Sequence, residues 1–487
     1  TNSTPFFAGF HHVLFGRKQS SAQQQLRSRI AALREGSLCQ LAGVCEPWTP
    51  SKLLEPTTQG ANSRRRSYTM AVTFWAFLSQ VMSPDSPCRE TVRKVQAWHA
   101  TRRLPVPSTS TGAYCQARSR LPLKSLHNIQ AHSAAELQRG VRSEQLWLGR
   151  HVKVVDGTGV SMPDTPENQA VWPQSRNQTN GCGFPTAKLV GCFCLASGAL
   201  LDLAEGNKHI HESRLFRKQY GLFNEGDVAL TDRGFCSYLS VAELQFKGVD
   251  TVMRIHKSRP TDFRKGKRLG PKDRLITWTK PIRRPKHISE SEWQAIPETL
   301  TLRMLHIQID VPGFRTESIV IVTTLTDPIA YPAEELAKLY LRRWSVELFF
   351  RDIKITLGMD VLRCRTPEMV RKEIALHVIA YNLIRGLMQQ AAALYDVDIT
   401  RLSFKGSVDT LRQWTDTFNA SHSQPREQRR LFNQLLQIIA EDTVPYRPER
   451  SEPRVRKRRP KNYRLMTGHD TKTHLENPPK MCLSKCH

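Results

Sequence analysis

The sequence predicts an α/β protein in which a sheet-forming core is preceded and followed by helical regions. Three observations lead to this prediction. Short β-branched runs alternate with helical segments from Val152 onward, residues 300–311 and 317–325 alternate apolar and polar side chains, and apolar residues recur at helical spacing on either side of this core. Alternating strands and helices are typical of a sheet whose faces are covered by helices.

The first helical region is predicted over residues 70–147. Val72, Trp75 and Leu78 recur at the spacing of one helical face, as do apolar residues further along. We expect a small helical domain here that binds DNA. Before it, we expect a helix near residues 22–41 and a linker rich in Ser, Pro and Thr over residues 47–63.

Two short apolar runs are expected to be strands that end at an aspartate. Asp156 follows a valine-rich run and precedes Gly157, and Asp232 follows Val228–Leu230 and precedes Gly234. A buried strand that runs into an Asp and a glycine directs a carboxylate into a cleft, although each Asp alone also suits a simple turn or helix cap. Further strands are expected at 188–195, 200–204 and 251–255, with helices at 213–219 and 238–247.

The interval between Asp232 and Glu347 holds 114 residues, which is too long for one connection between neighbouring elements. It contains the two alternating segments and many basic residues, so we expect a β-rich insertion over residues 257–326. Trp278 and Trp293 in this insertion suit packing better than ligand binding. Long helices are then expected at 367–394, 408–418 and 428–440.

The charge balance indicates a polyanionic partner. Lys and Arg exceed Asp and Glu by 28, and residues 447–464 alone carry nine Lys or Arg and two Glu. Such a balance favours nucleic acid, with a membrane surface as the weaker alternative. We find no apolar run of 18 residues and no signal-peptide pattern, and the 11 scattered cysteines are typical of free thiols in a cytoplasmic protein. We expect no structural zinc.

The strongest candidate site lies in residues 340–354, YLRRWSVELFFRDIK. On one helix at about 100° per residue, Glu347, Lys354 and Arg343 would lie about 20°, 40° and 60° from Tyr340. A carboxylate can bind a hard metal ion, while cations and a phenol can bind phosphates. The same pattern also suits a solvated helix face with ion pairs. The two strand-end aspartates favour the functional interpretation.

These residues resemble the DDE transposases of bacterial insertion sequences, in the subgroup named after insertion sequence 4. Tyr340, Arg343, Glu347 and Lys354 have the signature spacing of that subgroup without a gap. The resemblance covers roughly residues 64–466. It is carried by the blocks VVDGTGVSMPDTPENQ, LTDRGFCSYLSVAEL, LSFKGSVDTLRQW and RVRKRRPKNYRLM and by residues 68–122.

The resemblance implies a ribonuclease H-like catalytic core, which the residue pattern alone would not distinguish from other α/β folds. It implies an enzyme that cleaves the ends of a mobile element and joins the 3′ hydroxyl ends to target DNA. Asp156, Asp232 and Glu347 would be the catalytic, metal-binding residues for two Mg²⁺ ions, with Mn²⁺ as a substitute. Tyr340, Arg343 and Lys354 would hold DNA phosphates.

The expected partners are double-stranded DNA, as terminal inverted repeats and as target, and a second copy of the chain in the DNA complex. The alternatives are a DNA-binding protein without catalysis and a metal-dependent nuclease. The predicted division of the chain is an extension at 1–67, a helical DNA-binding domain at 68–147, a catalytic core at 148–256 and 327–366, a β-rich insertion at 257–326, a helical region at 367–445 and a basic tail at 446–487.

Overall fold

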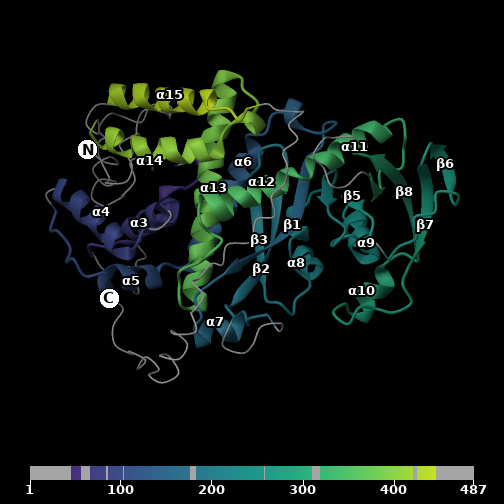
Figure 1. Cartoon of the computed structure of the whole chain (residues 1–487), viewed down its shortest axis with the longest axis horizontal. Coiled ribbons are helices and arrows are strands. Elements are labelled where there is room, and N and C mark those ends of the chain that lie inside the picture. Colours follow the sequence, from purple (N-terminus) through teal and green to yellow (C-terminus); the bar gives the residue numbers. More distant parts are fainter. Residues whose placement is uncertain are drawn as a thin grey trace, which may run out of the picture.

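A mixed α/β architecture with one large sheet and many helices is seen in the computed structural model (Figure 1). The structure describes residues 45, 47–55, 66–83, 86–101, 104–175, 183–256, 258–309, 318–420 and 425–445. The predicted helix near residues 22–41 and the basic tail lie outside these residues. No helix in the described ranges is long and apolar enough to cross a bilayer.

The first half of the sheet contains five strands in the order β3-β2-β1-β4-β5. β1 pairs antiparallel with β2 and parallel with β4, which pairs parallel with β5. Each of the five predicted strands is present, with ends shifted by a few residues. Their bounds are Val152–Ser161 for β1, Thr186–Cys194 for β2, Leu200–Gly206 for β3, Val228–Thr231 for β4 and Asp250–Arg254 for β5.

The second half of the sheet comes from the segment predicted to be rich in strands. β9 pairs antiparallel with β5, so the two halves form one continuous nine-stranded sheet. Trp278 is buried in β7 with the Arg259 guanidinium 3.6 Å above its ring, and Trp293 is buried in α10 (Glu290–Ala295). Both tryptophans pack, as expected. The strands are β6 (Lys267–Gly270), β7 (Asp273–Thr279), β8 (Thr299–Gln308) and β9 (Ser318–Thr323).

Helices cover both faces of the sheet. A Cβ added to Gly157 on β1 would meet the carboxyl group of Glu212 in α8 (Glu212–Lys218), whereas one added to Gly191 would meet Phe350 in α12 (Ser345–Arg351). Gly191 lies directly opposite Asp156 in the β1–β2 ladder. Because successive residues of a strand face opposite sides, α8 and α12 lie on opposite faces of the sheet.

The long helix α13 (Pro367–Tyr395) joins the sheet to the helices of both terminal regions (Figure 1). It is buried on all sides through most of its length, as expected for a helix with little polar surface. Its polar residues are paired: Asn382 bonds the backbone of Leu200, and Arg385 donates to the carbonyl of Ser197. The long helix predicted at residues 367–394 is therefore confirmed.

The predicted helices around α13 are also present. The N-terminal group contains α3 (Met70–Met82), α4 (Cys88–Thr101), α5 (Gly112–Arg120) and α6 (Leu123–Arg139), and the C-terminal pair is α14 (Phe404–Ala420) and α15 (Pro425–Glu441). α3, α6, α14 and α15 all contact α13. The predicted linker contains one short 3-10 turn, η1 (Ser51–Leu54).

Candidate active site

Asp156 lies within β1 and not at its end, which corrects the prediction from the sequence. Gly157 and Gly159 do not break the strand, because both remain paired with β2 opposite Val190 and Lys188. What ends before Asp156 is the parallel pairing with β4, whose last partners are Val155 and Thr231. The Asp156 carboxylate therefore lies at the point where β1 continues without β4 beside it.

Asp232 follows β4 directly, as predicted. The N–H group of Gly234 donates a 2.8 Å hydrogen bond to its Oδ1 atom, and the N–H group of Gly157 does the same for Oδ1 of Asp156. Since β1 and β4 run parallel and their pairing stops one residue before each aspartate, both carboxylates emerge at the same end of the two strands.

The predicted single helix over residues 340–354 is wrong. α11 (Ala333–Arg342) ends before Arg343, and α12 begins at Ser345. At this junction the N–H groups of Val346 and Glu347 bond carbonyls three residues back instead of four, so the chain is wound more tightly. After α12 comes a π-helix, η4 (Asp352–Thr356), which is wound more loosely. Equal steps of 100° per residue therefore do not describe this face.

Arg343 connects two of the three predicted catalytic carboxylates. Its Nη1 atom lies 3.4 Å from Oδ2 of Asp156, and its Nη2 atom lies 3.8 Å from Oε1 of Glu347 in α12. The Arg343 side chain is 10% exposed, that of Asp156 21% and that of Glu347 61%. One buried guanidinium therefore bridges a strand carboxylate and a helix carboxylate that face solvent to different degrees.

The electrostatics of Asp156 indicate that the three carboxylates act on one another. Its pKa is raised to about 6, mainly by burial, and the negative charges of Asp232 and Glu347 contribute to this rise. The Gly157 N–H group and Arg343 oppose this rise in pKa. A group of negative charges with too little compensation is an environment that favours a bound cation.

Tyr340, the first residue of the predicted phosphate-binding set, is buried at the end of α11. Burial raises the pKa of its phenol, the charge of Arg343 opposes the rise and Asp232 adds to it, so the ring lies within the field of the carboxylate group. Tyr340 packs edge-on against Trp344, and the Arg343 guanidinium lies 4.9 Å from the Trp344 ring. These two rings hold Arg343 against the carboxylates.

Lys354 lies in the π-helix η4 and reaches back to β1. Its Nζ atom donates a 3.2 Å hydrogen bond to Oγ1 of Thr158 and lies 3.0 Å from Oδ1 of Asp360. Thr158 is two residues beyond Asp156, so both side chains face α12. The sequence analysis did not single out Thr158, although its i,i+2 spacing from Asp156 on a strand was a signal that could have found it.

The oxygen donors predicted for a metal ion are the carboxylates of Asp156, Asp232 and Glu347. In the described residues, no three His, Cys, Asp or Glu side chains are grouped closely enough to be recognised as a metal site. Two of the three carboxylates instead share Arg343. The donor set still fits a hard divalent cation, since it consists of carboxylate oxygens with uncompensated negative charge.

Comparisons with known proteins support a function for this arrangement. The family model described as "Transposase DDE domain" matches residues 147–383. The chain contains a DDE transposase domain. This domain includes all six residues that the sequence analysis assigned to the site, and the family generally uses divalent metal ions.

Curated proteins that are similar to this chain are named as transposases of insertion sequence elements. The chain is 26% identical over 443 residues to the transposase InsG of insertion sequence element IS4 from Escherichia coli K12, covering 90% of this chain and 96% of that protein. A transposase of insertion sequence element IS421 from Escherichia coli is 34% identical over 71 residues, 15% of this chain and 19% of that protein. The resemblance to this family is therefore confirmed.

Among solved structures, a piggyBac transposase synaptic complex with hairpin DNA aligns with a TM-score of 0.40 and 9% identity. The alignment covers 80% of this chain and 81% of that chain.

Proposed function

We propose that the chain is a transposase that cleaves DNA at the ends of a mobile element and joins the resulting 3′ hydroxyl ends to target DNA. The observation that supports this proposal is the position of Arg343 between Asp156 and Glu347, together with the electrostatic influence of Asp232 on Asp156. Asp156 and Glu347 both contact the guanidinium, and Asp156 senses the charge of Asp232. Three carboxylates from two strands and a helix form a site that suits phosphodiester chemistry.

The proposed ribonuclease H-like core is supported by the directions of the five strands. β1 has an antiparallel neighbour on one side and a parallel neighbour, β4, on the other; Asp156 lies in β1 and Asp232 directly follows β4. We propose that residues 148–256 and 327–366 form this core and that β6 to β9 are the insertion that widens its sheet. The remaining divisions stay as predicted from the sequence.

The side chains of the site divide the work between positioning and charge. Arg343 orients the Asp156 carboxylate and compensates part of the negative charge, while Tyr340 and Trp344 limit the movement of Arg343. Lys354 fixes the π-helix to Thr158 and places a cation near a DNA phosphate. Divalent Mg²⁺, or Mn²⁺ as a substitute, held by the three carboxylates would activate the attacking oxygen and stabilise the leaving oxygen.

The partners in this proposal are element ends, target DNA and a second copy of the chain. The excess of 28 positive charges favours contact with the phosphate backbone. The same charge would also serve a nuclease without joining activity or a DNA-binding protein without catalysis, so the reaction itself has to be measured.

Incubation of the full chain with its element ends, target DNA and Mg²⁺ tests the proposal. We expect cleaved ends and joined products, and Asp156→Asn, Asp232→Asn or Glu347→Gln should abolish both while DNA binding persists. Asp164→Asn is the matched control, because Asp164 is an exposed carboxylate of the same domain outside the site. Cleavage without joining would assign a nuclease, and binding without cleavage would assign a DNA-binding protein.

A further inference from the structure

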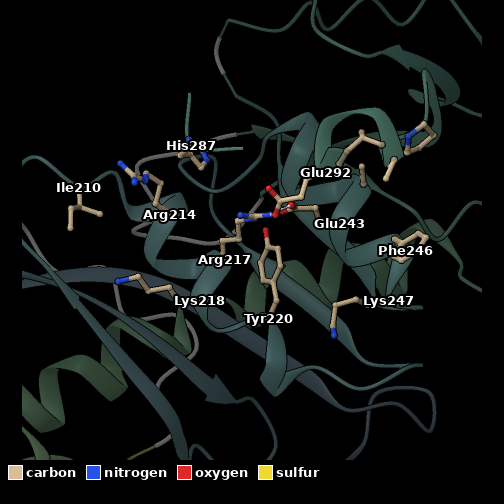
Figure 2. Close-up of a pocket in the computed structure, with 14 residues that line it drawn as sticks. Ile210, Arg214, Arg217, Lys218, Tyr220, Glu243, Phe246, Lys247, His287 and Glu292 are labelled. Carbon is tan, nitrogen blue, oxygen red and sulfur yellow. Dashed lines mark hydrogen bonds and ion pairs between the residues drawn. The ribbon is translucent and has the colours of Figure 1, made fainter. Parts of the chain in front are cut away.

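A cavity of about 580 Å³ lies apart from the carboxylate site, between α8, α9 (Tyr238–Phe246) and α10 (Figure 2). Its walls are apolar at Ile210, Ala242 and Ile296, and charged side chains surround its centre. A cavity of this size with an apolar wall and a few polar groups is typical of a ligand site. The cavity lies on the face of the sheet that α8 covers, which is opposite the face that α12 covers.

The positive charges around this cavity are only partly compensated. Arg217 at the centre lies 2.8 Å from Glu243 and 2.7 Å from Glu292, so these two carboxylates are already paired. In contrast, the exposed side chains of Arg214, Lys218 and Lys247 have no hydrogen bond or ion pair with any other described residue. Four Arg and Lys side chains against two Glu therefore leave an excess of positive charge, which favours an anionic ligand.

Helix ends explain part of this charge. Lys218 and Lys247 lie at the C-terminal ends of α8 and α9, where the helix dipole stabilises cations without any ligand. Arg214 lies in the first turns of α8, where the same dipole disfavours a cation. It also points toward the open side of the cavity, away from the two glutamates (Figure 2). The position of Arg214 therefore needs another explanation.

Phe246 lies on the other rim of the cavity and is 86% exposed (Figure 2). An exposed aromatic ring across from unpaired cations combines the two contacts by which proteins hold a nucleotide. Cations bind the phosphate, and the ring stacks on the base without regard to sequence.

The two helices that flank the cavity begin near the carboxylate residues in the chain, on the opposite face of the sheet from the Asp156 carboxylate. α8 begins beside Gly157, the neighbour of Asp156, and α9 begins six residues after Asp232. Helices of 7 and 9 residues at 1.5 Å per residue extend about 10 and 14 Å.

We propose that the cavity between α8, α9 and α10 binds one nucleotide unit of the DNA strand that extends from the carboxylate site, with its phosphate on Arg214 and Lys218 and its base on Phe246. This proposal rests on the proposed function only for the source of the nucleotide. The cavity, its unpaired cations and its exposed ring support a nucleotide ligand by themselves.

Equilibrium binding of a fluorescent single-stranded oligothymidylate to the full chain tests the proposal. Arg214→Gln/Lys218→Gln should weaken binding and reduce the slope of log affinity against log salt by about 0.7, the value for one lost phosphate contact. Phe246→Ala should weaken binding on the order of tenfold or more, as for other stacked bases. The charge-matched control is Lys405→Gln/Arg430→Gln, which removes two exposed cations from α14 and α15.

The proposal would be overturned if Arg214→Gln/Lys218→Gln lost no more affinity for the oligonucleotide than the control variant. An unchanged affinity of Phe246→Ala would also overturn it. Competition with AMP distinguishes the two sources of a nucleotide: a strand site binds the oligonucleotide more tightly, whereas tighter binding of AMP would overturn the assignment to DNA. Cleavage assays on the same variants separate this proposal from the proposed function. Variants that bind like the control while the wild-type chain cleaves DNA would reject the cavity and leave the transposase assignment intact.

Discussion

Two arginine–aspartate pairs, each with its aspartate on the nine-stranded sheet, differ in the number and length of their hydrogen bonds. Arg303 on β8 donates three hydrogen bonds of 2.7 to 3.2 Å to Asp273 on β7 and a fourth to the carbonyl of Tyr331, and both side chains are almost fully buried. Arg343 reaches Asp156 at 3.4 Å and Glu347 at 3.8 Å, and the second carboxylate is mostly exposed.

The difference indicates two purposes for the same pair of residue types. The bidentate pair uses the full fork of the guanidinium, which fixes β7 against β8 and leaves no charge for a ligand. The longer contacts of Arg343 leave carboxylate oxygens free, and burial with neighbouring charges raises the pKa of Asp156 to about 6. The first pair is complete within the fold, whereas the second leaves the Asp156 and Glu347 carboxylates only partly compensated, as the proposed site requires.

The largest effect on stability is expected at the complete pair. Asp273→Ala leaves the buried Arg303 charge without its partner, so the free energy of unfolding should fall by about 3–5 kcal/mol. Urea unfolding measures this loss, and the cleavage rate per folded molecule should be unchanged. A loss below about 1 kcal/mol, or a catalytic defect in fully folded protein, would remove the contrast between the two pairs.

The second largest effect is expected in catalysis, at Arg343. Arg343→Gln should lower the cleavage rate about 100-fold, because a shift of about 1 Å in the reacting groups has effects of this size. The free energy of unfolding should change by less than about 1 kcal/mol, since the contacts to Asp156 and Glu347 are long. Arg343→Lys is a useful second variant, because it keeps the positive charge but replaces the planar guanidinium fork with a single nitrogen atom. A large drop in stability with a parallel loss of rate would instead make Arg343 a structural residue.

The contrast between these regions also shows where sequence patterns were sufficient to predict the secondary structure. The strand runs before Asp156 and Asp232 and the apolar pattern of α13 predicted their elements, because each pattern reports local burial. The break at Arg343 and the π-helix at Lys354 could not be read from residue spacing, because packing against β1 and the Trp344 ring decides how tightly the chain winds there. The spacing therefore selected candidate residues whose chain segment is not the single regular helix that the spacing assumed.

A smaller effect is expected from the raised pKa of Asp156. Between pH 4 and 6 the folded chain holds a proton on Asp156 that the unfolded chain releases, because the folded pKa is about 6 and the ordinary value is 3.8. The free energy of unfolding should therefore fall as pH rises through this window. At pH 7, the free energy of unfolding of Asp156→Asn should be about 2 kcal/mol higher than that of wild type. Urea unfolding of both proteins at pH 4 and pH 7 measures this difference.

The comparison between wild type and Asp156→Asn isolates this group, since burial also raises the pKa of Asp352 to about 6 in both proteins. The exposed Asp164→Asn should show no such difference between the two pH values. Equal stability of Asp156→Asn and wild type at pH 7 would show that Arg343 already compensates the charge of Asp156, and the contrast with Asp273 would be lost.

The smallest effect is expected at Lys354. Its contacts are longer than the shortest contact of Arg303 and shorter than both contacts of Arg343. Its ammonium bonds Thr158 and pairs with the partly exposed Asp360, so Lys354→Gln should cost less than about 1 kcal/mol of stability. If it also places a charge on a DNA phosphate, the cleavage rate should fall about tenfold, the value of one charge-assisted hydrogen bond. Lys338→Gln on α11 is the matched control, because Lys338 pairs with Glu334 and Glu335 on the surface. A rate equal to that of this control would limit Lys354 to anchoring the π-helix on β1.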